Sequence, residues 1–506
     1  PIEVINWPNI KVTDWIMEIT NKAKIGFDPW LHSVDEIEQY KRSIENTDIT
    51  LQATENLVDT IWKDQPAAPT AKSFPYEDEF AGATQSNKRK TLAKDLKVYG
   101  NSAAVITLPE GIAWLLNIRG GDVEHLPIVQ AFSILHSNNE VDIFVDKTKV
   151  ENLEKHFGDG IKLYNESEFL SQLQKLTGSI CIDKSSLPFA AYEGLLASKA
   201  TLDPRGDITA LPKACKNEIE LSRARDAHLI DAIAMCKFLC WLNSQPAGML
   251  TEIDLVIELE SFRSANPELY DISFETICAS GPNAALPHYR VNNESNRTIE
   301  NGEVILIDSG GQYKSGTTDI TRTTALGQVS SEIKQAFTLV LKGMISISKL
   351  RFPKGMAGCD LDAFARVFLW SEGLDFAHGT GHGVGQFLSV HEGPQRLSRT
   401  SNVPFEAGMI ISNEPGFYKE GHFGIRIENL LTVTKAPKLE RSIVAEMFIF
   451  ETLNFVPIDK NLIKKDLMST DEIIWLNEYH SQCREKIRAH LDENERIWLD
   501  HATNKL

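Results

Sequence analysis

The sequence predicts several mixed α/β and α+β domains, and three observations support that prediction. At 506 residues the chain is longer than one hydrophobic core usually supports. Short apolar strand patterns alternate with helical patterns over residues 1–213, which is typical of α/β domains. A long helical pattern and then a region rich in strands and glycines follow, which indicates a separate domain of different construction.

Two breaks divide the chain into three expected domains. Residues 64–69 contain two prolines, each of which removes a hydrogen-bond donor and restricts the residue before it. Pro204, Gly206 and Pro212 mark the second break. The expected domains are therefore residues 1–73, 74–213 and 214–506.

The main elements follow from hydrophobic periodicity. Strands are expected at residues 25–27, 103–107 and 141–145. Helices are expected at residues 33–44, 57–62, 85–97 and 217–243, and a helical tail at residues 471–491 ends the chain. In the helix at 217–243, the apolar residues from Ile219 to Leu239 recur at intervals that predict one buried face.

Composition and charge exclude several classes of function. The hydrophobic share of 42% and the charged share of 24% are those of an ordinary globular protein. The net charge of −18 repels a phosphate backbone, so we expect no nucleic-acid partner. No apolar run is long enough to span a bilayer, and the first residues lack the layout of a signal peptide. We expect no membrane partner and a cytoplasmic location.

The seven cysteines do not indicate a disulfide framework. Their number is odd and their spacing irregular. Cys236 and Cys240 could share a helix face, but two cysteines alone make a poor metal site. We expect reduced thiols in the core.

A hairpin pattern brings two aspartates together. The apolar run 304–307 ends at Asp308, a loop follows, and residues 317–323 are again rich in β-formers. If the strands pair about the midpoint between Tyr313 and Lys314, Asp308 lies directly opposite Asp319. Two carboxylates so close destabilise a hairpin unless a cation lies between them. In a different register both carboxylates would be exposed to solvent.

Three histidines lie within a glycine-rich loop. His378, His382 and His391 fall among glycines too dense for a stable helix. Glycine allows the backbone to approach a ligand closely, and neutral imidazole is the commonest nitrogen ligand of metals. A single histidine would more often be a core residue, whereas three in such a loop indicate a site.

Two glutamates complete the candidate ligands. The strand pattern at 409–413 runs into Glu414, directly before a Pro-Gly turn. Residues 424–429 alternate, so Arg426 and Glu428 share one side of the strand, opposite two isoleucines. That charged side could simply be solvated. Four carboxylates with one imidazole, however, suit two dications such as manganese, cobalt or zinc.

With these residues the chain resembles the pita-bread metallopeptidases, and among them the aminopeptidase P family (Xaa-Pro aminopeptidases) of the long three-domain cytosolic type. Further segments that resemble this family lie at residues 113–120, 123–125, 287–289 and 475–477. The resemblance implies two creatinase-like α/β domains, the first one partial here, and then a pita-bread catalytic domain with a helical extension. It also implies two divalent ions per chain, usually manganese, and often a homodimer.

The family's site residues carry over onto positions of this chain. The five metal ligands correspond to Asp308, Asp319, His382, Glu414 and Glu428, of which Asp319 and Glu428 match the ligands that contact both metals. The histidines that line the substrate site correspond to His288, His378 and His391, and a supporting arginine corresponds to Arg426.

One departure from the family concerns the first domain. Members of this type begin with about a further half-domain, which contains an Asp-Gly-Arg-Tyr stretch whose arginine reaches toward the substrate. The present sequence has no such stretch, and residues 25–29 resemble mid-domain sequence. The chain therefore either lacks its start or has a reduced first domain.

The resemblance implies hydrolysis of the N-terminal Xaa-Pro bond by a water molecule that two metals activate. Glu414 is the candidate for proton transfer to the leaving proline nitrogen, and His288 and His391 are candidate donors to the substrate. The expected partners are peptides with proline at the second position. Two alternatives remain, a prolidase that cuts only Xaa-Pro dipeptides and a pita-bread protein that has lost its metals and serves only as a binding module.

Overall fold

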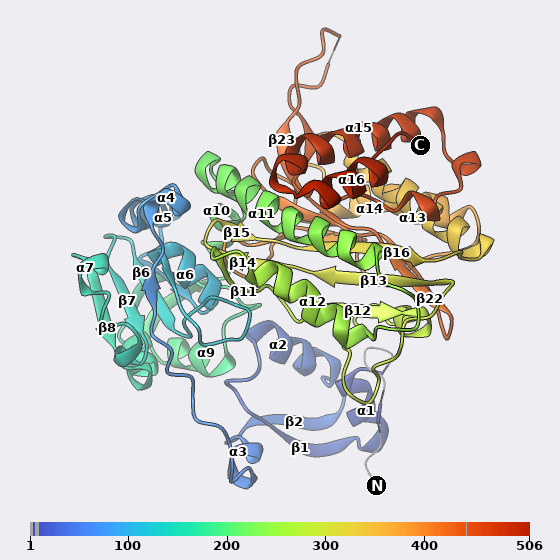
Figure 1. Cartoon of the computed structure of the whole chain (residues 1–506). Coiled ribbons are helices and arrows are strands. Elements are labelled where there is room, and N and C mark those ends of the chain that lie inside the picture. Colours follow the sequence, from blue (N-terminus) through green and yellow to red (C-terminus); the bar gives the residue numbers. More distant parts are fainter. Residues whose placement is uncertain (1–3, 6–9, 442) are drawn as a thin grey trace. The chain divides into compact units, whose positions relative to one another are not determined.

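The computed structural model describes residues 4–5, 10–441 and 443–506, which pack into two compact units (Figure 1). Unit 1 comprises residues up to 75 together with 83–123 and 128–209, and unit 2 comprises residues 76–82, 124–127 and 210–506. Residues 1–3 and 6–9, at the start of the expected first domain, lie outside the described residues. The division into three domains stays a prediction.

Unit 1 contains a two-stranded parallel sheet, β1-β2, and a six-stranded mixed sheet in the order β10-β9-β4-β6-β7-β8. Its main elements are α1 (Val12–Ile19), β1 (Lys22–Phe27), α2 (Val34–Ser43), β2 (Asp48–Ala53), α3 (Leu57–Ile61), α5 (Gln85–Val98), β4 (Ala103–Ile106), α6 (Pro109–Leu116), β6 (Phe132–His136), β7 (Val141–Phe144), β8 (Ile161–Tyr164), β9 (Thr177–Cys181), α9 (Phe189–Leu196) and β10 (Lys199–Asp203). The expected strands and helices of this part are confirmed to within two residues, except that β1 begins three residues earlier.

Unit 2 consists of antiparallel sheets, including β12-β13-β16 and β17-β24-β23-β20, with helices packed around them. Its main elements are α11 (Glu218–Asn243), α12 (Glu252–Ser264), β12 (Ile277–Ser280), β13 (Glu303–Ser309), β14 (Gly311–Tyr313), β15 (Gly316–Thr317), β16 (Ile320–Leu326), α13 (Ser331–Ser348), β17 (Arg351–Pro353), α14 (Gly358–Trp370), β18 (Gly381–His382), β20 (Ile410–Asn413), β21 (Gly416–Lys419), β22 (Phe423–Arg426), β23 (Asn429–Lys435), β24 (Met447–Thr452), α15 (Thr470–Ile487) and α16 (Glu493–Ala502).

The long helix α11 begins where the sequence predicts, because Asn217 caps it. The Asn217 side chain accepts from the backbone N–H groups of Ile219 and Glu220, and the Glu220 carboxylate accepts from the Asn217 N–H. The predicted buried face is correct at Cys236 and Leu239 but wrong at Ile219, which is 45% exposed. Ile219 lies in the first helical turn, where Glu220 and Leu221 are the buried side chains instead.

The C-terminal tail contains one more helix than expected. The predicted helix at residues 471–491 corresponds to α15 and the 3-10 turn at Arg488–His490. The prediction that this helix ends the chain is wrong, because α16 follows at Glu493–Ala502. Asp492 caps α16, and Glu495 accepts from the Asp492 N–H. This Asp-x-x-Glu pattern is an N-terminal helix signal that the sequence contained.

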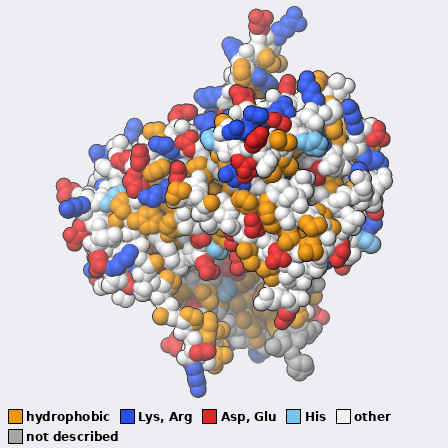
Figure 2. Space-filling view, in the orientation of Figure 1, with side chains coloured by type: hydrophobic (Ala, Val, Ile, Leu, Met, Phe, Trp, Pro, Cys, Tyr) orange, Lys and Arg blue, Asp and Glu red, His pale blue; other side chains and the backbone are white. Residues whose placement is uncertain are grey.

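No helix in the described ranges is long and apolar enough to cross a bilayer. Acidic and basic side chains are mixed over the visible face rather than gathered into one patch of a single sign (Figure 2). All seven cysteines are free thiols. The prediction that they lie in the core is correct for Cys181, Cys236, Cys278 and Cys483 but wrong for the other three, which are half-buried.

Candidate metal centre

A cavity of about 570 Å³ in unit 2 collects every site residue that the sequence predicts. These residues are Asp308, Asp319, His382, Glu414, Glu428, His288, His378, His391 and Arg426. They come from segments separated by as many as 140 positions, and the antiparallel sheets of unit 2 bring these segments together.

The first two carboxylates come from the hairpin β13–β16, but in another register than predicted. Asp308 pairs with Thr321, so the prediction that Asp308 lies directly opposite Asp319 is wrong by two residues. The reason is the turn: Tyr313 pairs with Gly316, which leaves Lys314 and Ser315 as a two-residue connection. Asp319 is therefore a diagonal neighbour of Asp308 on the same face, still within reach of a shared ion.

Backbone contact fixes His382 and its tautomer. The His382 N–H donates to Ser412 Oγ at 2.8 Å, and a Cβ on the preceding Gly381 would lie 1.8 Å from the Ser412 carbonyl oxygen. His382 Nδ1 lies 3.0 Å from the Gly383 carbonyl oxygen, which can only accept, so Nδ1 carries the hydrogen. Nε2, which carries the lone pair in the neutral ring, lies 3.5 Å from Asp319 Oδ2 and 3.4 Å from Glu414 Oε1.

Glu414 and Glu428 lie at strand ends. Glu414 follows β20, and its N–H donates to the Thr380 carbonyl in the histidine loop at 2.8 Å. Glu428 lies between β22 and β23, and its Oε2 accepts from Thr321 Oγ1 at 2.7 Å. The predicted alternation is confirmed, because Arg426 and Glu428 line the cavity while the isoleucines at 425 and 427 are buried in the core.

These side chains fit a metal ion. Ligand atoms of Asp319, His382 and Glu428 lie within 4.8 Å of one another. Asp308 Oδ1, Asp319 Oδ1 and Glu428 Oε1 are buried and have no hydrogen-bond partner among the residues that the structure describes. A buried carboxylate oxygen without a partner is costly, and divalent cations at these atoms would remove that cost.

The electrostatics of the carboxylates agree with this fit. Burial, and after it the charges of neighbouring carboxylates, raises the pKa of Asp319 and of Glu428 well above the ordinary range. Burial also raises the pKa of Glu414. Ionising these carboxylates together is therefore unfavourable without a counter-charge, and two dications would offset that cost.

An arginine and a tyrosine connect the carboxylates to His378. Arg426 Nη2 donates to Asp308 Oδ2 at 2.5 Å, and Arg426 Nη1 donates to the Tyr418 hydroxyl at 2.7 Å. His378 Nδ1 donates to the Gly379 carbonyl, so the Tyr418 hydroxyl donates to His378 Nε2 at 2.8 Å. Burial raises the pKa of Tyr418 to about 12 and lowers that of His378 to about 4, so both groups are neutral at pH 7.

Sequence reasoning missed Tyr418. No residue pattern at 416–419 indicates that Tyr418 belongs to the site, because β21 is short and the sequence does not show that it pairs with β22. Gly416 pairs with Arg426, which makes Tyr418 a diagonal neighbour of Arg426 on one face. The pairing of these two strands is the signal that would have found it.

Further histidines and polar groups line the cavity. The His391 ring packs edge-on against the His382 ring, with 4.3 Å between centroids. Burial lowers the pKa of His391 to about 4, so that its imidazole is neutral at pH 7 and offers one N–H donor. The sequence also gave no sign of an ion pair between Glu275 and Arg290 at this cavity.

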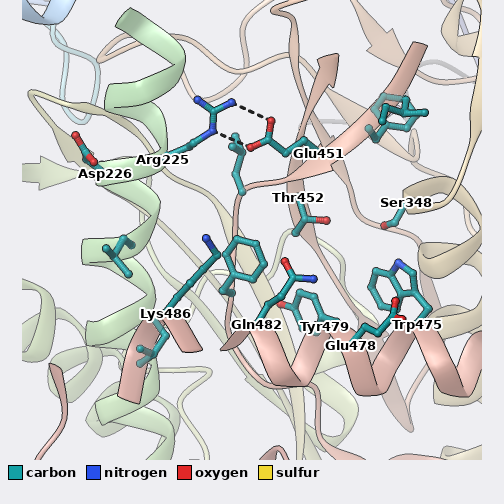
Figure 3. A pocket seen from close by; sticks show the side chains of 16 residues that line it. Arg225, Asp226, Ser348, Glu451, Thr452, Trp475, Glu478, Tyr479, Gln482 and Lys486 are labelled. Atoms are coloured by element: carbon teal, nitrogen blue, oxygen red, sulfur yellow. Dashed lines mark hydrogen bonds and ion pairs between the residues drawn. The ribbon is translucent and has the colours of Figure 1, made fainter. Parts of the chain in front are cut away.

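A second cavity of unit 2 has a similar volume, about 580 Å³, but different chemistry. It lies between α11, β24 and α15, and its Arg225 and Glu451 side chains pair with each other (Figure 3). No histidine is among the residues that line it. Size alone therefore does not distinguish the candidate site, whereas the ligand chemistry does.

Three segments of the chain match known protein families. Residues 64–220 match the creatinase/prolidase N-terminal domain, residues 222–435 match metallopeptidase family M24, and residues 446–506 match the C-terminal region of that family. The expected fold class, a creatinase-like N-terminal part followed by a pita-bread domain, is confirmed.

Among curated proteins, Aminopeptidase P2 from Arabidopsis thaliana is 37% identical over 98% of this chain and 75% of its own length. A probable Xaa-Pro aminopeptidase P from Paracoccidioides lutzii is 36% identical over 97% of this chain and 84% of its own.

Among solved structures, X-prolyl aminopeptidase from Caenorhabditis elegans, described as a cytosolic enzyme with a di-nuclear active site, superposes with a TM-score of 0.93. It is 32% identical and covers 99% of this chain and 84% of its own. An Xaa-Pro dipeptidase from Bacillus anthracis shares only the fold, with a TM-score of 0.59 and 24% identity over 74% of this chain and 99% of its own.

Proposed function

The chain belongs to metallopeptidase family M24, among the Xaa-Pro aminopeptidases, and from that premise we propose how its residues hydrolyse the bond between an N-terminal residue and proline. One observation carries the proposal: five ligand-type side chains converge in one cavity, and three of their buried oxygens have no hydrogen-bond partner in the described part of the chain. The proposed ligands are Asp308, Asp319, His382, Glu414 and Glu428.

The ligand set favours hard or borderline ions, and we propose manganese, with cobalt or zinc as substitutes. Two divalent ions bound there would lower the pKa of a water molecule and withdraw electron density from the substrate carbonyl. Arg426 holds Asp308 in place and, through Tyr418, also fixes the ring of His378.

Glu414 moves the proton in this proposal. Its Oε1 accepts from Ser412 Oγ at 3.1 Å, which leaves Oε2 to take the proton of the attacking water. Burial raises the pKa of this carboxyl, so its carboxylate is a stronger base for that proton than an exposed glutamate is. Glu414 then delivers the proton to the proline nitrogen as the carbon–nitrogen bond breaks.

Two histidines bind the substrate in this proposal. His391 is neutral, and its N–H can donate to the carbonyl oxygen on which negative charge develops. His288 lines the same cavity and would donate to the peptide backbone. Neither side chain is among the proposed metal ligands.

The test of this function is a comparison of three peptides with the manganese-loaded protein. Arg-Pro-Pro-Gly should release arginine, whereas Arg-Ala-Pro-Gly and N-acetyl-Arg-Pro-Pro-Gly should remain intact by mass spectrometry. Cleavage of the Arg-Ala peptide at a comparable rate would contradict the proline requirement. Cleavage of Xaa-Pro dipeptides alone would assign the chain to the prolidases.

We further propose a cytoplasmic homodimer. Phe364, Val367 and Trp370 are 45%, 47% and 43% exposed and recur every three residues on α14, an apolar stripe for a second copy to cover. Light scattering should give twice the chain mass, and Val367→Lys should give the mass of one chain. An unchanged mass in the variant would contradict this interface.

A further inference from the structure

Buried ions that do not line the metal cavity support the loop that carries His382 and His391. Lys213 Nζ lies 2.9 Å from Glu392 Oε2, and Lys216 Nζ lies 3.5 Å from Glu392 Oε1. All three side chains are buried. They form a cluster of two cations and one carboxylate directly beside the candidate site.

This ion cluster, Lys213–Glu392–Lys216, is joined to the backbone of the loop. Lys216 Nζ donates to the Val384 carbonyl at 2.6 Å, and the Glu392 N–H donates to the Gly383 carbonyl at 2.8 Å. Residues 383 and 384 directly follow His382, and Glu392 directly follows His391. A displacement of the cluster would therefore displace both histidines.

The opposite end of the loop is held in a similar way. Arg366 on α14 donates to the His378 carbonyl at 2.8 Å, and Asp362 accepts from Thr380 Oγ1 at 2.7 Å. Arg366 and Asp362 also pair with each other. Charged groups from two other segments thus hold the two ends of a loop that is too rich in glycine to hold its own shape.

Stability alone does not explain such a cluster. Removing charges from water is costly, and replacement of a buried ion pair by well-packed apolar side chains is often neutral or stabilising. Hydrogen bonds between charged groups do restrict the position and orientation of a side chain, because the atoms of Glu392 and Lys216 can bond only to partners at particular places. Such restriction is useful next to a group that contacts the substrate, because that group must be held in place to within a fraction of an ångström.

From these contacts we infer that Lys213, Glu392 and Lys216 position the His391 imidazole for the reaction, and that Glu392 affects turnover only through His391. The inference rests on the proposed function, because it requires His391 to contact the substrate. Glu392 is a positioning residue in this scheme. A misplacement of about 1 Å at a group that contacts the transition state can lower turnover by about 100-fold.

A double-mutant cycle tests the inference. The variants are Glu392→Gln, His391→Ala and the double substitution, assayed on Arg-Pro-Pro-Gly with manganese content measured on each. Glu392→Gln should lower kcat about 10- to 100-fold, with KM changed less than about twofold and the wild-type metal content kept. In the His391→Ala background, Glu392→Gln should change kcat by less than about twofold, because the group it positions is gone.

An equal loss of kcat from Glu392→Gln in both backgrounds, or loss of metal in Glu392→Gln, would overturn the inference. A His391→Ala variant with unchanged kcat would instead contradict the proposed role of His391. If Glu392→Gln does not fold, Lys213→Gln carries the same cycle, since Lys216 still pairs with Glu392. The matched control is Glu472→Gln, which removes a carboxylate that pairs with Lys342 at 2.8 Å and should leave kcat unchanged.

Discussion

At the scale of single residues, the candidate site consists of groups that the fold leaves incomplete. Asp308, Asp319 and Glu428 each present a buried oxygen to which no group of the described residues donates a hydrogen bond. His382 has one ring nitrogen held by a carbonyl and the other turned to carboxylates. Each of these atoms is a Lewis base, and metal ions are the partners that satisfy all of them together.

Substitution of His382 and substitution of His391 should have different effects on bound metal and on kcat. His382→Ala removes a proposed ligand, so bound metal and activity should both fall. His391→Ala removes only a donor to the substrate, so metal should stay while kcat falls about 100-fold. Elemental analysis and kinetics on both variants check this, and equal metal loss in the two would show that the roles are wrongly assigned.

All the proposed ligands were named from the sequence. The four carboxylates were found as candidates from strand and turn patterns, whereas the choice of His382 among the three loop histidines came from the resemblance to the aminopeptidase P family. Tyr418 could not be predicted, since its role depends on the pairing of β21 with β22. The ion cluster could not be predicted either. Lys213 and Lys216 are far from Glu392 in sequence, and lysines at such spacing normally lie on a solvated surface.

At the scale of elements, close backbone approach positions the ligands. A Cβ at Gly381 would lie 1.8 Å from the Ser412 carbonyl oxygen, and one at Gly310 would lie 1.9 Å from the Thr318 carbonyl oxygen. Glycine is therefore required at residue 381, where β18 contacts β20, and at residue 310, where the first strand of the hairpin approaches the backbone of Thr318. The sequence showed that glycines were dense here but not which strands they approach.

Substitution of these glycines should be sensitive to position. Gly381→Ala forces β18 away from β20, so the free energy of unfolding should fall by about 2 kcal/mol or more and metal affinity should fall with it. Gly379→Ala is the matched control, because its Cβ would lie 3.3 Å from Ser398 Cβ, a contact that a small shift relieves. Urea titrations of both variants measure this, and equal losses would contradict the argument.

The hairpin shows why register is harder to predict than strand existence. Both strands were predicted, and the face shared by Asp308 and Asp319 was correct, but the pairing slipped by two residues. A slip of two leaves every side chain on the same face, so the hydrophobic pattern cannot detect it. The position of the two-residue turn decides the register, and here no Asn-Gly or Asp-Gly pair marks it.

At the scale of the whole molecule, one buried histidine couples folding to pH. His480 on α15 is fully buried, and its Nε2 accepts from the Ile458 N–H at 3.1 Å. Burial lowers its pKa to about 3. An unfolded histidine has a pKa of about 6.5, so between these two values the unfolded chain binds a proton that the folded chain does not.

The stability that His480 confers should thus be complete above pH of about 6.5 and be lost as the pH falls toward 3. The slope from this group is about 1.4 kcal/mol per pH unit. His480→Gln keeps an acceptor for Ile458 but does not titrate, so its unfolding free energy should vary less steeply below pH of about 6. Parallel wild-type and variant curves in chemical denaturation from pH 4 to 7 would contradict this coupling.

The central claim, that five side chains hold two metal ions on which hydrolysis depends, is tested most directly by titrating manganese into the metal-free chain while bound metal and Xaa-Pro cleavage are both recorded. We expect close to two ions per chain at full activity and no cleavage at zero bound metal. Asp319→Asn should bind fewer than two ions and lose activity by more than about 100-fold, whereas Ser309→Ala should titrate as wild type. Full activity at zero bound metal, or two ions retained in Asp319→Asn, would contradict the claim.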